Sequence, residues 1–261
     1  MHCQILSSGS RGNATLIRAG ELRVLVDAGL PLGNLRERLE AARLPLRGID
    51  HILVTHGHLD HARSAGALAK RQQATVHCAE AIMRHRAVRR APRLATIRIG
   101  RDNEVIGEHG EVLLYRPVLL PHDCDPTVAY RLEHEGGVVA IVTDLGVPDA
   151  TAARRLRGAH VLVLEFNHDP DMLAAGPYPP SLKRRVGGDR GHLSNEQACV
   201  MLERLAGPDL HTLVLAHLSH TNNTPGHAVD AAFTTLQRLG MTHVEILVAS
   251  QDEIGPNLKV S

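Results

Sequence analysis

The sequence predicts a layered α/β protein whose β-sheets combine parallel and antiparallel strands. Short runs rich in valine, isoleucine and leucine alternate with segments that repeat apolar residues at helical spacing. Some of these runs are separated only by a turn signal, which indicates hairpins among the parallel strands. Because 261 residues suffice for a large core and one α/β domain often reaches this size, we expect a single domain over residues 1–261.

The strand and helix signals follow one another in order along the chain. Hairpins are expected at 16–26 and 130–142, where a turn containing glycine separates two apolar runs. Strand-like runs at 23–29, 51–56 and 211–218 precede helical patterns at 32–44, 61–72 and 227–239. The run at 160–166 precedes a proline-rich loop instead.

The two expected hairpins share a further feature. Each ends in Asp-x-Gly, with Asp27 in the first and Asp144 in the second, and the next strand of each leads into histidine. A repeated order of this kind predicts a diverged internal duplication. Two similar halves packed face to face would bring these carboxylates and imidazoles to one edge of the molecule.

Composition excludes several classes of protein. A net charge of +1 argues against a uniformly basic nucleic-acid binder and against a polybasic membrane-surface protein. No apolar run approaches the roughly eighteen residues of a membrane-spanning helix, and the chain has no tryptophan and few other aromatic residues for stacking bases. The scattered cysteines and the absence of a secretory pattern predict a soluble, cytoplasmic protein with reduced thiols and no membrane partner.

The stretch THGHLDH, residues 55–61, concentrates metal-ligand chemistry at the end of a strand-like run. His56 and His58 flank a glycine that permits a tight turn, Asp60 lies where a helix N-cap is expected, and His61 lies in the first turn. Imidazoles and carboxylates suit zinc, with manganese and iron as alternatives. The competing interpretation is a satisfied histidine cluster at a helix start, and this spacing favours the metal site.

The H-x-H-x-D-H pattern of these residues resembles the metallo-β-lactamase superfamily. The resemblance implies a four-layer αββα fold, in which two mixed β-sheets lie between helices. It also implies two divalent metal ions, with Zn2+ expected first and Mn2+ as the alternative. The implied ligands of one ion are His56, His58, His122 and Asp144, and those of the other are Asp60, His61, Asp144 and His217.

The resemblance also matches Asp27 to the superfamily's orienting aspartate, which would hydrogen-bond a ligand instead of binding metal. The alternative is a turn-forming aspartate before glycine. Every matched position follows a strand-like run, where side chains can converge on a common edge.

Other motifs indicate the branch of the superfamily. GHLSNEQA, residues 191–198, and HLS, residues 217–219, resemble motifs of the tRNA-maturing ribonuclease Z branch. Together with SSGSRGN, PHDCDP, VTDLG, EFNHDPDML, GPYPPSLKRRV and HLSHTNN, they resemble the YycJ/WalJ (VicX) family across nearly the whole chain. That family is regarded as DNA-exonuclease-like, acting from 5′ ends. Two positions depart from its pattern: Phe166 replaces a small polar residue and His220 replaces a lysine.

The expected catalytic residues are Asp60, His192 and Glu165. We expect His192, oriented by Glu165, to protonate the departing oxygen as a general acid. The alternative for His192 is a residue at a capped helix N-terminus. Expected substrate contacts are Ser8, Ser10 and Asn13 in the first loop, and His168 after the strand at 160–166.

Three features, namely the first loop, His168 and the stretch 84–101, each have a structural alternative that the residues leave open. The first loop could present backbone amides to a phosphate, or it could be a tight connection into the hairpin. His168 could contact substrate or be a loop residue. The stretch 84–101, with seven arginines, could follow a DNA backbone or be a solvated basic helix face.

Three functions from different classes therefore remain. A metal-dependent DNA nuclease agrees with most motifs, and DNA is then the expected partner. A small-molecule thioesterase or lactonase would use the same metals and suits the low net charge. A metal-binding regulatory partner without turnover is the third.

Overall fold

The computed structural model describes residues 1–44 and 48–260. Two compact units make up the chain. Unit 1 comprises Met1–Pro117, Leu132–Gly137 and Ser250–Ser261, and unit 2 comprises Val118–Arg131 and Val138–Ala249. The single domain expected over residues 1–261 stays a prediction.

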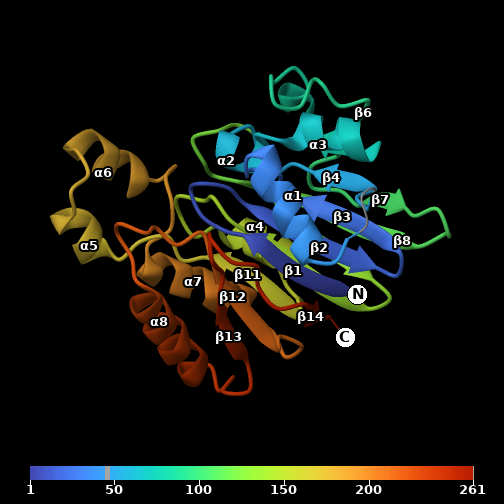
Figure 1. The fold of residues 1–261 in the computed structure, drawn as a ribbon. Coiled ribbons are helices and arrows are strands. Elements are labelled where there is room, and N and C mark those ends of the chain that lie inside the picture. Colours follow the sequence, from blue (N-terminus) through green and yellow to red (C-terminus); the bar gives the residue numbers. More distant parts are fainter. Residues whose placement is uncertain (45–47, 261) are drawn as a thin grey trace. The chain divides into compact units, whose positions relative to one another are not determined.

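Unit 1 contains one complete seven-stranded sheet (Figure 1). Strands β1 to β3 and β14 pair antiparallel, whereas β3 to β6 pair parallel, so the sheet is mixed as expected. Its strand order is β14(Leu258–Lys259), β1(His2–Ser7), β2(Ala14–Ala19), β3(Leu22–Val26), β4(His51–Leu53), β5(Thr75–Cys78) and β6(Arg93–Thr96).

The second sheet also has seven strands and is also mixed. Strands β10 to β13 pair parallel and lie in unit 2 except for Gly137 of β10, and β7 pairs antiparallel with β8. Glu135 and Gly136 both have positive φ, as a tight two-residue hairpin turn between β9 and β10 requires. The order is β13(Glu245–Val248), β12(Thr212–Ala216), β11(Val161–Glu165), β10(Gly137–Val142), β9(Thr127–His134), β8(Val112–Leu120) and β7(Asn103–Ile106).

Helices follow the strands within each unit. Unit 1 has α1(Leu32–Ala41), α2(Leu59–Ala62), α3(Ala65–Gln72) and the 3-10 helix η1(Glu80–Ile82). Unit 2 has α4(Ala150–Leu156), α5(Pro170–Ala175), α6(Pro180–Val186), α7(Asn195–Leu205) and α8(Pro225–Arg238). No helix in the described ranges has the length and apolar character needed to cross a bilayer.

The core of unit 2 explains how its helices are held. Apolar side chains of α4, α7 and α8 pack with alternate residues of the neighbouring strands β11 and β12 in one buried cluster. Ser194 caps α7 through a capping box with Gln197, which fixes where this helix begins. Phe166 is fully buried in the same cluster, so this departure from the family pattern is a core residue.

Polar residues lie at the carboxyl ends of the parallel strands, where α/β sheets commonly bind ligands. Asp27 follows β3, Asp144 follows β10 and His217 follows β12. All three have left-handed backbones, with φ of 63°, 64° and 56°. Each such conformation costs a non-glycine residue about 1–3 kcal/mol. Three of the residues predicted to belong to the metal site therefore have strained backbone conformations.

Candidate metal centre

In unit 1 the residues after β4 form a cluster of candidate metal ligands. His56 and His61 are fully buried, and their ring centroids lie 4.2 Å apart. His58 meets His56 edge to face, with 4.8 Å between the centroids. A cluster of imidazoles with Asp60 beside it, 3.7 Å from His61 Nε2, has the donor chemistry of a borderline divalent ion.

The predicted start of the helix in this motif is wrong by two residues. The N-cap of α2 is His58, not Asp60, because the His58 carbonyl accepts from the amides of His61 and Ala62. His58 is still extended, with φ −62° and ψ 149°. Asp60 is therefore in the first turn of α2 and is not its N-cap residue.

Asp27 binds the imidazole of His61 and not only its own turn. Its Oδ2 lies 2.7 Å from His61 Nδ1, and its Oδ1 accepts from the Thr55 amide at 2.8 Å. Burial raises the pKa of Asp27, and the partner His61 opposes that rise. With Nδ1 donating to a carboxylate, His61 presents Nε2 as an acceptor, which is the atom that a metal would bind.

The first loop packs onto this motif. Asn13 accepts a hydrogen bond from the Gly9 amide through Oδ1, and its Nδ2 lies 2.9 Å from His61 Nε2. The amides of Ser8, Gly9, Arg11, Gly12 and Asn13 all donate within unit 1. These bonds favour the tight connection over an amide nest for phosphate. Substrate contacts by Ser8, Ser10 and Asn13 stay a prediction, and only Ser10 of these three is exposed.

In unit 2 a second cluster forms at the ends of β10, β11 and β12. Asp144, Glu165, His192 and His217 each place a ligand atom within 4.8 Å of the others. Asp144 Oδ1 lies 3.5 Å from His192 Nδ1 and 3.8 Å from His217 Nε2. His122 also approaches Asp144, with 3.9 Å between Nε2 and Oδ1. Two carboxylates and three imidazoles gathered in one buried place fit a divalent metal ion.

Glu165 connects these imidazoles. It is fully buried, and its Oε1 accepts from Nδ1 of His192 at 2.8 Å and from Nδ1 of His217 at 3.1 Å. Oε2 accepts from the amides of Leu145 and Leu193, both at 3.2 Å. Burial alone would raise the pKa of Glu165, but the interactions with His192 and His217 outweigh it and lower that pKa to about 2. The carboxylate is therefore ionised at neutral pH.

The pKa of His192 is shifted in the opposite direction. Burial lowers it, but the charge and hydrogen bond of Glu165 raise it more, so the net shift is upward. The His192 side chain is 20% exposed, in contrast with the buried His217. An imidazole that is held by a carboxylate and reaches solvent has the geometry of a general acid.

Two of the predicted residues have partners that the sequence did not reveal. His122 Nδ1 donates to the carbonyl of Gly191 at 2.9 Å, which leaves Nε2 as the acceptor nitrogen. Thr55 Oγ1 lies between Asp27 and His56, at 2.9 Å and 3.0 Å. Thr55 and Gly191 are the first residues of the motifs THGHLDH and GHLSNEQA, but neither was expected to contact a candidate ligand.

His168 is buried in unit 2, in the loop between β11 and α5, and lies next to the N-cap of α7. It is 3% exposed and pairs with Ser194 in an isolated β-bridge, and burial lowers its pKa. Its Nδ1 is buried without a hydrogen-bond partner in the described part of the chain. A contact with substrate stays a prediction for this residue.

Comparison with known proteins now identifies the class. The model of the metallo-β-lactamase superfamily matches residues 8–217, so the chain belongs to that superfamily. The metallo-β-lactamase fold protein YhfI from Bacillus subtilis superposes with a TM-score of 0.70 at 15% identity, over 98% of this chain and 99% of its own. The fold class predicted from the sequence is confirmed, and the chain is a metal-dependent hydrolase of this superfamily.

Within the superfamily the chain belongs to the YycJ/WalJ family. Exodeoxyribonuclease YycJ of Bacillus anthracis is 32% identical over 229 residues, which are 85% of this chain and 84% of the relative. Exodeoxyribonuclease WalJ of Streptococcus pneumoniae is 29% identical over 224 residues, 84% of this chain and 82% of the relative.

Proposed function

We propose that this protein is a metal-dependent phosphodiesterase that degrades DNA as an exonuclease, in the 5′ to 3′ direction. The observation that carries the proposal is the 32% identity, over 85% of the chain, to a protein named an exodeoxyribonuclease. The imidazole and carboxylate clusters of the two units support it, because they retain every donor that the superfamily motif requires.

The residues that would hold two ions are those of the family pattern. His56, His58 and His122 would serve one ion, Asp60, His61 and His217 the other, and Asp144 both. When bound, such ions supply a hydroxide nucleophile at neutral pH and neutralise the phosphoryl oxygens. Zinc is the expected metal, and manganese is compatible with the same donors.

The protein's own carboxylates prepare the donor atoms. Asp27 accepts from Nδ1 of His61 and Glu165 accepts from Nδ1 of His217, so both rings keep Nε2 as the acceptor. Such outer partners typically contribute tenfold to a hundredfold in metal affinity or activity. Both rings are thus aligned before any ligand arrives.

His192 would deliver a proton to the departing deoxyribose oxygen. Its Nδ1 is bound to Glu165, so the proton transferred is the one on Nε2. The interactions with Glu165 raise the pKa of His192 and so favour its protonated form, which is the form an acid catalyst uses. Glu165 would stabilise the imidazolium of His192 before the proton is transferred, and it would keep the neutral ring oriented afterwards.

We expect His192→Ala to slow DNA hydrolysis by about a hundredfold or more while metal content stays at the wild-type level. Turnover of 5′-labelled DNA and metal analysis by mass spectrometry measure the two quantities. His109→Ala, at an exposed histidine in unit 1, is the matched control. Full activity in His192→Ala would remove this residue from the mechanism.

The proposed function itself is tested by offering several substrates at once. Metal-loaded protein is incubated with 5′-labelled duplex DNA, single-stranded DNA, RNA and a generic thioester, with Asp60→Ala as the inactive control. Release of nucleotides from the 5′ end of DNA supports the proposal. Consumption of the thioester alone would refute it, and two bound metals without any turnover would favour a regulatory function.

A further inference from the structure

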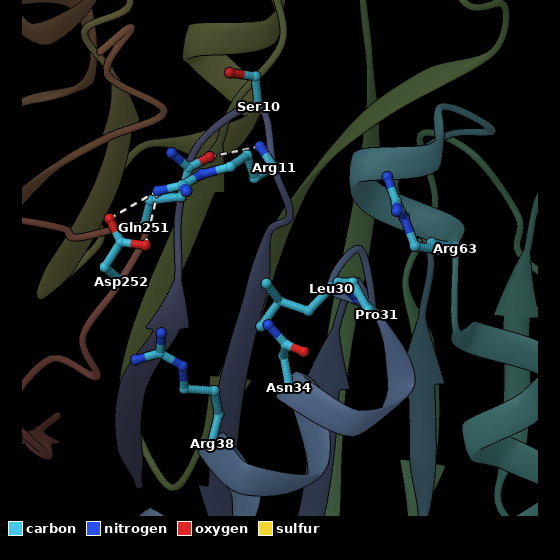
Figure 2. A pocket seen from close by; sticks show the side chains of 9 residues that line it. All are labelled: Ser10, Arg11, Leu30, Pro31, Asn34, Arg38, Arg63, Gln251 and Asp252. Carbon is cyan, nitrogen blue, oxygen red and sulfur yellow. Dashed lines mark hydrogen bonds and ion pairs between the residues drawn. The ribbon is translucent and has the colours of Figure 1, made fainter.

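Two hollows on unit 1 adjoin at Arg63, the residue that follows α2. The first, of about 320 Å³, is lined by Ser10, Arg11, Asn34, Arg38 and Arg63 among others. Figure 2 shows Arg38 and Arg63 lying on either side of Leu30, Pro31 and Asn34. The second, of about 480 Å³, is lined by Leu59, Arg63, Arg86, Ala87, Arg89 and Arg90. Because Arg63 lines both, we treat the two hollows together as one path past the helix that carries Asp60 and His61.

The lining of this path is strongly basic. It contains six arginines and a single carboxylate, Asp252, which is paired with Arg11 at 2.7 Å. Among the described residues, no carboxylate forms an ion pair with Arg38, Arg63 or the arginines of the second hollow. Clustered like charges repel one another, and the cost falls when an anion lies between them. A chain with a net charge of +1 thus concentrates positive charge here.

The arginines of the second hollow lie on a segment whose backbone packs closely against α3. Residues 83–90 form consecutive turns and not the helix that the basic stretch could have been. The Gly66 amide of α3 donates to the Ala87 carbonyl at 2.8 Å, and a Cβ at Gly66 would lie 2.7 Å from that oxygen. Val88 is fully buried, whereas Arg89 and Arg90 are exposed. The close contact with α3 therefore positions the backbone of this segment, and Arg89 and Arg90 line the hollow together with Leu59 of α2.

The structure also divides the arginine-rich stretch 84–101 into two parts. Arg93 binds Thr75 and the Gln73 carbonyl at the sheet edge, and Arg98 binds the Asp102 carbonyl. Arg101 is exposed and lines neither hollow. Only the part at 86–90 joins Arg63 and Arg38 along the path.

We propose that this path, which we call the Arg63 track, binds the backbone phosphates of DNA next to the phosphate being cleaved. The proposal rests on the proposed nuclease function and names its strand-binding surface. Guanidinium groups bind phosphate oxygens through paired N–H donors, and such contacts position a strand without reading its sequence. Leu59, 37% exposed beside Arg63, adds apolar contact for a deoxyribose.

The test compares two sets of three substitutions in a background that binds DNA without cleaving it. The track variant combines Arg63→Ala, Arg89→Ala and Arg90→Ala with Asp60→Ala. The control variant combines Asp60→Ala with alanine at three exposed arginines outside both hollows, Arg71, Arg101 and Arg155. The probe is a fluorescein-labelled 20-nucleotide DNA strand, and affinity is measured by anisotropy from 50 to 200 mM salt.

The slope of log K against log salt should fall by about one for each track arginine removed, or slightly less because the probe is single-stranded. Affinity at 100 mM salt should fall tenfold or more in the track variant and change less than twofold in the control. Equal slopes in the track variant and the parent would overturn the track. Equal losses of DNA affinity in the track and control variants would also overturn it, because they would show that attraction to the protein's positive charge is not localised at the track. A parent protein that does not bind DNA would overturn it as well.

These outcomes separate the track from the nuclease function. Hydrolysis of DNA by the wild type, together with unchanged binding in the track variant, refutes the track alone. Salt-dependent binding that is lost in the track variant, without hydrolysis by the wild type, refutes the nuclease function alone.

Discussion

Glu165→Gln would disturb both imidazoles of the unit 2 cluster in one substitution. The carboxylate accepts four hydrogen bonds, two from imidazoles on Oε1 and two from backbone amides on Oε2. A glutamine of the same shape has only one acceptor oxygen, so its NH2 group must face two of these donors. If the oxygen stays with the amides, His192 and His217 must both change tautomer. His217 then loses the lone pair on Nε2.

The magnitude can be estimated in two ways, both of which reflect the same interactions of Glu165 with His192 and His217. Hydrogen bonds to charged groups contribute about 1.5–3 kcal/mol each, so losing both charged imidazole bonds costs about 3–6 kcal/mol. The pKa of Glu165 falls from 4.5 to about 2 on folding, and at about 1.4 kcal/mol per unit this is about 3 kcal/mol. Because the folded pKa is depressed, this stabilisation is present above pH 4.5 and is lost as the pH falls towards 2.

The assay is thermal unfolding of metal-free protein at pH 7.5, followed by metal analysis after reloading. A loss of about 3 kcal/mol lowers the midpoint by about 6–12 °C in a chain of this size, and metal affinity should fall tenfold to a hundredfold. Glu196→Gln, at an exposed position of α7, is the control. A midpoint within 2 °C of this control, or wild-type metal content after dialysis, would show that Glu165 does not organise the cluster.

Two further predictions concern unit 1. Burial lowers the pKa of His77 from 6.5 to about 4. Between these two pH values His77 is protonated in the unfolded chain but not in the folded protein, so acid favours unfolding. The free energy of unfolding should therefore fall by about 2 kcal/mol between pH 7.5 and 5. Urea titrations should show a smaller fall in His77→Gln, and an unchanged one would assign the acid sensitivity elsewhere. Gly66→Ala forces its Cβ against two backbone oxygens and should cost about 1–3 kcal/mol and weaken DNA binding. Gly33→Ala, with open space around its Cβ, should do neither.

The elements most predictable from the sequence were those whose pattern is local. Alternating apolar runs and Asp-x-Gly turns located β3, β4, β10 and β12, because strand burial and turn geometry depend on neighbouring residues. The start of α2 was misplaced because an aspartate in a first turn and an aspartate at an N-cap have the same short-range pattern. Only the bonds to the His58 carbonyl distinguish the two positions.

The hydrogen-bond partners of the imidazoles could not be predicted from local pattern. The Gly191 carbonyl lies 69 residues from His122 and accepts from its ring. Glu165 was expected to orient His192 alone, yet it also binds His217, 52 residues away. The cause is the parallel pairing of β11 and β12, which sets Glu165 opposite Ala216. Such register is a property of the assembled sheet, and no spacing within one segment encodes it.

The internal duplication stays a prediction, and it would explain the backbone better than the chemistry. Asp27 and Asp144 follow β3 and β10 and share nearly the same left-handed φ. Yet Asp27 binds the Nδ1 of an imidazole, whereas the Asp144 carboxylate lies near the Nε2 atoms of His122 and His217. The carboxylate that orients an imidazole in unit 2 is Glu165, which comes from the next strand. A similar turn therefore places a carboxylate at the same point after each strand. Which imidazole that carboxylate contacts depends on the residues that the neighbouring strand places at the same edge of the sheet.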